Sequence, residues 1–273
     1  MKLSNHEHFE SVKPFDFSAT YIELYADSSE NVNYSHIHDE CEIYVNLSGD
    51  LSFIVENNIY PIKPGDIIIT RPHEYHHCVY HSNKLHRHFW ILFSSSGNEY
   101  LLDTFFDRKS GSANHLSLPP EYSAQFISLC YKLTKTEPLQ SRKFYNFFKL
   151  INILQKADIV NDTDEHYPKD ITYAINYINR HFENDISIGE IAKGAYVSIN
   201  TLERHFKKTL NISPYEYIKK KRLANAVKLL SSGCTVYEAS SQSGFSDYSN
   251  FIALFKNTYG ITPLKYKKSK HNL

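Results

Sequence analysis

Hydrophobic residues follow two different periods along the chain. Up to about residue 94, short runs rich in Ile, Val, Tyr and Phe alternate with turn residues such as Ser48-Gly49-Asp50 and Lys63-Pro64-Gly65-Asp66. Many short strands at even spacing are typical of a small barrel or sandwich. We expect the strands at residues 21–25, 41–47, 51–55, 66–70, 78–80 and 86–93.

Beyond Pro119-Pro120 the apolar residues recur at steps of three and four. This period, in residues 122–133 and again in 144–154, predicts two amphipathic helices. Both helices could pack on the barrel, or one of them could pair with its copy in a dimer. Residues 158–170 are polar and acidic, which is a linker composition. We therefore expect domains at residues 1–160 and 170–273, with a linker at 161–169.

Composition indicates a globular protein that stays in the cytoplasm. Hydrophobic residues make up 41% of the chain and charged residues 22%. No run approaches the roughly 20 apolar residues of a membrane span, and the first residues lack the apolar core of a signal peptide. The four cysteines, Cys41, Cys78, Cys130 and Cys234, are scattered and are expected to be reduced thiols.

The net charge of zero conceals two oppositely charged parts. Residues 1–168 hold 14 Lys and Arg against 22 Asp and Glu, whereas residues 169–273 hold 16 against 8. An acidic body joined to a basic domain suggests that only the second part meets a polyanion. Nucleic acid is the first candidate.

The basic domain contains an internal repeat. Glu190 and Glu238 are offset by 48 residues, whereas Phe206 and Phe255 are offset by 49. The extra residue falls at Gly244-Phe245-Ser246-Asp247, where a turn accommodates an insertion more easily than a helix does. Each copy is predicted to be a short helix, a tight turn and a second helix. These helix-turn-helix motifs cover about residues 188–208 and 236–257.

The second helix of each motif has an apolar and a polar face. Leu202 and Phe206, like Phe251 and Phe255, lie four residues apart and are expected in the core. The outer face can present polar groups to base edges, because an α-helix fits the DNA major groove. We expect these helices to start at Ser198, and at Ser246 or Asp247. A helix after Pro214, over residues 215–231, would join the motifs.

The second motif and its tail carry a family resemblance. Gly244-Phe245-Ser246-Asp247, Phe251, Phe255-Lys256, Gly260-Ile261-Thr262-Pro263 and Tyr266 stand in the signature order. Residues from about 170 to 268 therefore resemble the DNA-binding domain of the AraC/XylS regulators. The family often has a long polar residue where Ala253 stands, so the resemblance implies less base reading by the second motif.

The resemblance also implies which outer-face residues meet DNA. Base edges would be contacted by Asn200, Glu203, Arg204, Tyr248 and Ser249. Phosphates would be contacted by Ser198, Lys207, Lys208, Ser246, Asn250 and Lys256.

The N-terminal part resembles a cupin barrel at two motifs. His36-Ile37-His38-Asp39-Glu40-Cys41-Glu42 is similar to the first, and Pro64-Gly65-Asp66 with His76 to the second. Side chains two apart on a strand share a face, so His36 and His38 can point into one barrel. The resemblance places an effector pocket at His36, His38, Glu42 and His76, a set that could hold zinc, iron or manganese. In AraC-type regulators these positions often hold no metal, so we expect no cofactor.

The predicted fold is α+β with two domains: a cupin-like β-barrel with two helices, and an all-α domain of two helix-turn-helix motifs joined by a linker helix. The resemblance implies a transcription regulator, not an enzyme, whose barrel senses a small molecule, with a sugar suggested by family analogy. Its partners would be double-stranded DNA, the effector, RNA polymerase and a second copy of the chain, with no membrane.

Two alternatives remain open. The first is a metal-dependent cupin enzyme with a DNA-binding tail. The second is a constitutive regulator whose barrel serves only as an oligomerisation platform.

Overall fold

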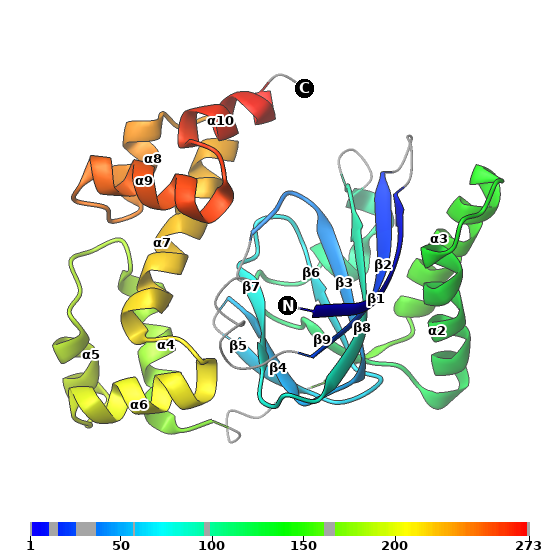
Figure 1. Ribbon diagram of the computed structural model, residues 1–273, viewed down its shortest axis with the longest axis horizontal. Coiled ribbons are helices and arrows are strands. Elements are labelled where there is room, and N and C mark those ends of the chain that lie inside the picture. The colour runs from blue at the N-terminus through cyan, green and yellow to red at the C-terminus, as the bar shows by residue number, and fades with distance from the viewer. Residues whose placement is uncertain are drawn as a thin grey trace. The chain divides into compact units, whose positions relative to one another are not determined.

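A computed structural model describes residues 2–10, 16–25, 37–56, 58–95, 99–160 and 167–271 (Figure 1). The chain divides into two compact units, residues 1–163 and 164–273, which are described separately below. The described strands lie in the first unit, and the second unit consists of helices. None of the described helices is long and apolar enough to cross a membrane.

Two antiparallel sheets form the body of the first unit. The larger has the order β1-β2-β8-β3-β6-β9-β10 and the smaller β5-β4-β7. The strands are β1 (Lys2–Glu10), β2 (Phe17–Tyr25), β3 (Cys41–Ser48), β4 (Leu51–Val55), β5 (Asn58–Ile62), β6 (Ile67–Thr70), β7 (His76–Tyr80), β8 (Leu85–Phe93), β9 (His115–Ser117) and β10 (Asp158–Ile159).

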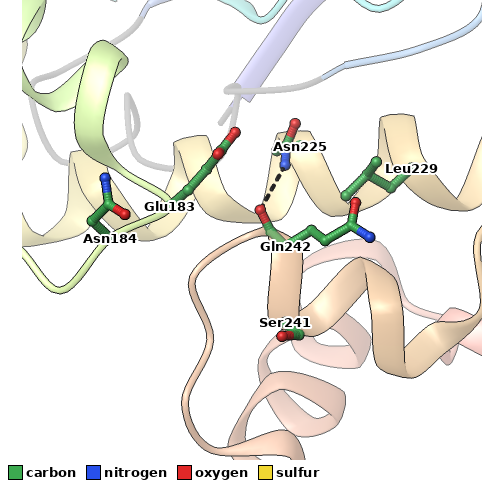
Figure 2. Close-up of a pocket in the computed structure, with 6 residues that line it drawn as sticks. All are labelled: Glu183, Asn184, Asn225, Leu229, Ser241 and Gln242. Carbon is green, nitrogen blue, oxygen red and sulfur yellow. Dashed lines mark hydrogen bonds between the residues drawn. The ribbon is translucent and has the colours of Figure 1, made fainter.

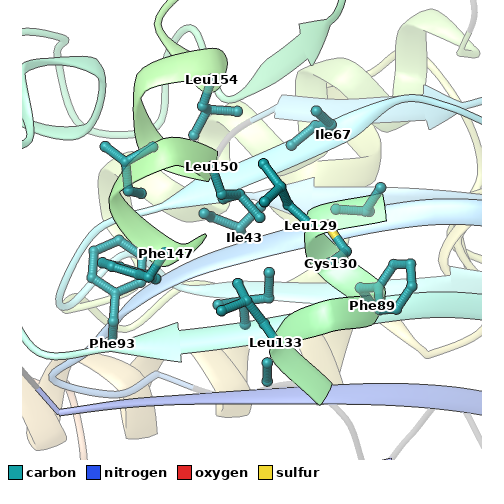
Figure 3. Packing of buried hydrophobic residues seen from close by; sticks show 14 of the residues in the cluster. Ile43, Ile67, Phe89, Phe93, Leu129, Cys130, Leu133, Phe147, Leu150 and Leu154 are labelled. Atoms are coloured by element: carbon teal, nitrogen blue, oxygen red, sulfur yellow. The ribbon is translucent and has the colours of Figure 1, made fainter. Parts of the chain in front are cut away.

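Alternation along the central strand β3 separates the two faces of the larger sheet. Ile43 and Val45 belong to the core under the helices, whereas Tyr44 packs toward the smaller sheet, with its ring centroid 5.0 Å from that of Phe53. The first face is covered by α2 (Pro120–Thr134) and α3 (Gln140–Leu154) (Figure 3). Both predicted helices are confirmed, and both pack on the sheet.

The core under these helices is apolar and aromatic. Phe147 stacks on Phe17 at 4.7 Å and meets Phe93 edge to face at 5.2 Å. Leu129 and Leu150 pack beside them against the sheet (Figure 3). Burying each such side chain contributes about 1.5–3 kcal/mol, so this core fixes the two helices on the sheet.

Four described strands, β1, β5, β9 and β10, were not predicted, and the sequences of three of them explain why. β5 contains Pro61, which sheets tolerate at an edge position such as the one β5 occupies. β10 lies inside the acidic stretch that we read as linker, and Asp158 pairs with Ser117 of β9. β1 is mostly polar, with Leu3 and Phe9 as its two apolar residues. Residues 161–166 of the predicted linker lie outside the described residues.

The second unit contains the two predicted helix-turn-helix motifs and the linker helix between them, in the predicted order. Its elements are α4 (Lys169–His181), α5 (Ile188–Gly194), α6 (Ile199–Leu210), α7 (Pro214–Ser231), α8 (Val236–Gln242), α9 (Tyr248–Tyr259) and α10 (Pro263–His271). Two further short helices, η2 (Glu99–Leu101) and α1 (Asp103–Phe106), belong to the first unit and not to this one. The linker helix α7 starts as the sequence predicts: Ser213 caps it, Pro214 is its first residue, and Glu216 completes a capping box.

Candidate functional site

The first helix-turn-helix motif is made of α5 and α6. Ser187 and Glu190 form a capping box that starts α5, and the hydroxyl of Ser198 accepts a hydrogen bond from Thr201 N at 3.1 Å to start α6. Leu202 and Phe206 are fully buried, as predicted. Because these two side chains anchor one face of α6 in the core, the opposite face of the helix points to solvent.

The predicted DNA-contacting residues of this motif lie on that outward face. Ser198, Asn200, Glu203, Arg204, Lys207 and Lys208 are all exposed. Lys207 Nζ donates to the carbonyl of Asn211 at 2.9 Å, so in this structure it caps the C-terminus of α6. The face combines a guanidinium, an amide and a carboxylate, which are the groups that distinguish base edges in the major groove.

The second motif is made of α8 and α9. Thr235 and Glu238 form the capping box of α8, and Asp247 rather than Ser246 caps α9, accepting from Asn250 N at 2.9 Å. Phe251 and Phe255 are fully buried, as predicted. The outer face carries Ser246, Tyr248, Ser249, Asn250, Ala253 and Lys256, all exposed.

Sequence reasoning missed a side-chain hydrogen bond that positions α6. His205 Nδ1 lies 2.6 Å from a carboxylate oxygen of Asp170, at the start of α4, and Asp170 is almost completely buried. His205 sits beside Arg204, so this contact fixes the rotation of α6 about its axis. The signal lay in a histidine next to the buried Phe206, but its partner is 35 residues away and no spacing rule identifies it.

In the first unit, three of the four predicted pocket residues come together. Nε2 of His38 and Nε2 of His76 each lie 3.1 Å from the same oxygen of Glu42. Their ligand atoms lie within 4.8 Å of one another, close enough to surround one ion. His36, the fourth, lies outside the described residues.

The hydrogen bonds of these two imidazoles determine what can lie between them. His38 Nδ1 lies 3.0 Å from the Glu40 carbonyl, and His76 Nδ1 lies 2.7 Å from the Glu74 carbonyl. A carbonyl can only accept, so both Nδ1 atoms donate, and the Nε2 of a neutral ring turns a lone pair toward Glu42. A cation, either a proton or a metal ion, is needed between them. Burial opposes protonation of His38, but the hydrogen bond and charge of Glu42 outweigh it and raise its pKa.

A buried ion pair holds the loop that carries His76. Arg108 Nη2 donates to Glu74 at 2.6 Å, and Gly111 N donates to the same carboxylate at 2.8 Å. Although burial works against its ionisation, the hydrogen bonds and charge of Arg108 lower the pKa of Glu74. The ionised Glu74 carboxylate is thus held by several donors. This fixes the backbone carbonyl of Glu74 where it accepts the hydrogen bond from His76 Nδ1.

Further polar residues, which were not predicted, line the face of the larger sheet that carries Glu42. Thr70 lies opposite Glu42, and Asn46 lies opposite His88. The amide of Asn46, the hydroxyl of Thr70 and Nδ1 of His88 are buried without a hydrogen-bond partner among the described residues. Burial lowers the pKa of His88 to about 3, so the ring is neutral at pH 7. The alternation of residues 42, 44 and 46 was the available signal.

The first unit, with its cluster of buried polar residues, and the two helix-turn-helix motifs of the second unit define a ligand-sensing DNA-binding regulator. Comparison with known protein families agrees. The family model of the AraC-like ligand binding domain matches residues 20–147, and that of the helix-turn-helix domain matches residues 191–269. Together these matches span about three quarters of the chain. The chain belongs to the AraC/XylS family and is a DNA-binding transcription regulator with a ligand-sensing domain.

Curated relatives match along most of their length. The HTH-type transcriptional regulator YdeC of Bacillus subtilis is 23% identical over 253 residues, 85% of each chain. The lactose operon transcription activator of Staphylococcus xylosus is 24% identical over 253 residues, 87% of each chain. The transcriptional activator RhaS of Mannheimia succiniciproducens is 24% identical over 235 residues, 84% of this chain and 87% of its own.

Proposed function

We propose that α6 is the principal reader of DNA sequence and that α9 contributes less specificity. The observation that carries this is the outward face of α6, where Asn200, Glu203 and Arg204 are exposed while the buried face and the His205–Asp170 pair hold the helix in place. Arg204 can donate two hydrogen bonds to a guanine. On α9, Ala253 stands at the corresponding place, which leaves base contacts to Tyr248 and Ser249.

Phosphate contacts would position these helices on the duplex. We assign them to Ser198, Lys207 and Lys208 around α6, and to Ser246, Asn250 and Lys256 around α9. Such contacts bind every sequence, so they set affinity and its dependence on salt instead of specificity.

Arg204→Ala tests this assignment. A duplex selected by the wild-type protein from a random pool should lose about 5–150-fold in affinity, the equivalent of about 1–3 kcal/mol, and random DNA much less. Lys208→Ala is the matched control, because it should weaken both duplexes equally and reduce the salt slope by about one. An Arg204→Ala protein that loses the same factor on both duplexes would contradict the assignment.

We infer that the effector is a small polar molecule bound in the barrel, and we propose a sugar. The buried and unsatisfied groups of Asn46, Thr70 and His88 need hydrogen-bond partners, which a polyhydroxylated ligand supplies. They lie on the face that carries Glu42, next to the predicted pocket residues. A relative from S. xylosus is named for the lactose operon.

Thermal-shift screening against a sugar panel tests the effector proposal. A ligand at 100 times its Kd stabilises the folded protein by about 2.7 kcal/mol. Asn46→Leu and His38→Ala should each reduce the shift and the response to effector while leaving basal DNA affinity unchanged. A normal shift in both variants would place the pocket elsewhere. If no metabolite stabilises the wild type, the constitutive alternative gains.

The second candidate is a barrel that responds to a metal ion. It is favoured by the two Nε2 atoms that face Glu42, since both rings are oriented by backbone carbonyls as metal ligands usually are. His38, Glu42 and His76 fit zinc, iron or manganese, which would supply a charge-dependent link between three segments of the barrel. Metal analysis of protein purified without added metal decides: stoichiometric metal, lost in His38→Ala, supports this candidate.

We further propose a homodimer that contacts RNA polymerase and has no enzymatic activity. Tyr145 and Phe148 are exposed on α3, at 63% and 41%, where a second copy could cover them. The names of the relatives describe transcription regulators and activators. Phe148→Asp should convert a dimer to a monomer in sedimentation of the full chain, and a wild-type monomer at micromolar concentration would refute the dimer.

A further inference from the structure

The two helix-turn-helix halves of the second unit meet at a polar contact on α7. Arg222 Nε donates to the carbonyl of Phe182 at 2.7 Å, and its Nη2 donates to the carbonyl of Asn184 at 2.8 Å. Both carbonyls belong to the turn after α4, a helix that packs on α5 and α6. One planar guanidinium thus ties the linker helix to the first half at two points.

The turn of the second motif reaches the same segment after α4 and shares one of its carbonyls, that of Phe182. Gly244 has φ +81°, and a β-carbon there would lie 2.7 Å from Phe182 O, 2.8 Å from Glu183 O and 3.0 Å from Arg222 Nε. No side chain fits in that space, so the backbone of the turn lies directly against the first half and against the guanidinium. Gly244 is therefore required by position as well as by conformation.

A second hydrogen-bonding residue extends this contact along α7. Asn225 Nδ2 donates to the Gln242 carbonyl at 3.4 Å (Figure 2). It also lies within donating distance of the Ser243 hydroxyl, at 3.2 Å. Beside it lies a hollow of about 360 Å³, lined by Glu183, Asn184, Asn225, Leu229, Ser241 and Gln242. Five of these six residues are polar. On this side, hydrogen bonds hold the halves together where a hydrophobic core would otherwise do so.

We propose that Arg222, Asn225 and Gly244 form a junction clamp that sets the distance and angle between α6 and α9, and with them the spacing of the two DNA segments that the protein accepts. The inference rests on the proposed contact of both helices with DNA. Arg222 and Asn225 act as positioning residues, since they hold backbone groups of both halves. A loosened clamp lets the halves turn independently and accept other spacings.

The experiment measures spacing preference in the full-length protein. Footprinting on a duplex selected by the wild type defines the two contacted segments, and one base pair is then inserted or deleted between them. Each change rotates one segment by roughly 35° relative to the other. The wild type should lose about tenfold or more in affinity, and Arg222→Gln should discriminate among the three spacings by less than about threefold.

Three further variants separate positioning from folding and charge. Arg222→Lys keeps the charge but not the two-pronged donor, so it should also relax the preference, and Asn225→Ala should do so more weakly. Lys228→Gln removes an exposed charge from the same helix and should weaken all spacings equally. A variant that is merely less stable lowers affinity equally on all three duplexes.

Two outcomes would overturn the clamp. If folded Arg222→Gln and Asn225→Ala both keep the wild-type spacing preference, the clamp is wrong and the two-helix contact stands. If the wild type itself ignores spacing, the clamp and the contact of α9 with DNA fall together.

Discussion

The two helix-turn-helix motifs share one backbone plan but use its turn differently. In the first, Tyr196 N donates to Lys193 O and Val197 N to Ala192 O; in the second, Gly244 N and Phe245 N make the same pair of bonds. Tyr196 and Gly244 are thus equivalent, and both have positive φ. Tyr196 is 96% exposed, whereas Gly244 touches the first half. Glycine is therefore required at this position of the turn only in the second motif, where the turn packs against the first half.

The second helices of the two motifs, α6 and α9, also differ in charge. α6 is capped by the neutral Ser198 and carries Glu203 and Arg204, whereas α9 is capped by the anionic Asp247 and presents Ala253. One motif has an outer face suited to reading bases, and the turn of the other is fitted against its neighbour. With α6 as the proposed reader, the duplication divides reading and docking between its copies.

The largest effect should come from the turn that docks. Gly244→Ala combines a left-handed backbone with overlap against two carbonyls, and should destabilise the second unit by about 3 kcal/mol. Gly260→Ala is the matched control, because φ is also positive there but nothing lies within 4 Å; it should cost only about 1 kcal/mol.

Helical circular dichroism during urea unfolding reports mainly on the second unit. Trp90, the only tryptophan, lies in the first unit, so its fluorescence transition should stay unchanged in both variants. Equal losses for Gly244→Ala and Gly260→Ala would show that the close approach to the first half is unimportant.

Sequence periodicity predicted what is local and missed what is brought together by folding. The cap at Ser198 and the buried pair Phe251 and Phe255 follow from short spacings because helix starts and helix faces are set by neighbours a few residues away; the second cap was narrowed to Ser246 or Asp247, and the structure has Asp247. Arg222 bonds to residues about 40 positions earlier, and no local pattern encodes that.

The barrel shows the same limit in its polar residues. His38, Glu42 and His76 were expected together from motif resemblance, and the structure brings them together. Asn46 shares a face with Glu42 by alternation along β3, a signal that went unused, whereas Thr70 and His88 were missed because only strand pairing places them on that face. β5 was missed because proline is typical of loops, and Pro61 lies in an edge strand, where sheets tolerate it.

The cap charges offer a smaller and separate test. Asp247→Ser keeps a capping oxygen, so helix stability should change little, but it removes a negative charge near the duplex. Affinity for all DNA should rise roughly two- to fivefold at low salt. Ser198→Asp, the reciprocal change, should lower affinity by a similar factor. Filter binding across a salt series measures both, and opposite shifts that vanish at high salt are expected; unchanged affinity in both would place the caps away from phosphate.

The smallest effect should come from the exposed turn, and it should be stabilising. A side chain in the left-handed region costs about 1–2 kcal/mol, whereas glycine loses about 0.5–1 kcal/mol more conformational entropy on folding. Tyr196→Gly should therefore stabilise the second unit by about 0.5–1 kcal/mol, since nothing packs on a ring that is 96% exposed. Tyr196→Ala removes the ring but keeps the β-carbon, so it should gain little.

The same two Tyr196 variants show whether the ring has a second use. If the turn only connects helices, affinity for the selected duplex stays at the wild-type value in both, and urea unfolding followed by circular dichroism shows a gain for glycine alone. A gain in both variants would mean that the ring, not the backbone, is the source of strain. A loss of DNA affinity in both, at normal stability, would mean that Tyr196 contacts the duplex, and the first turn would then share in DNA binding.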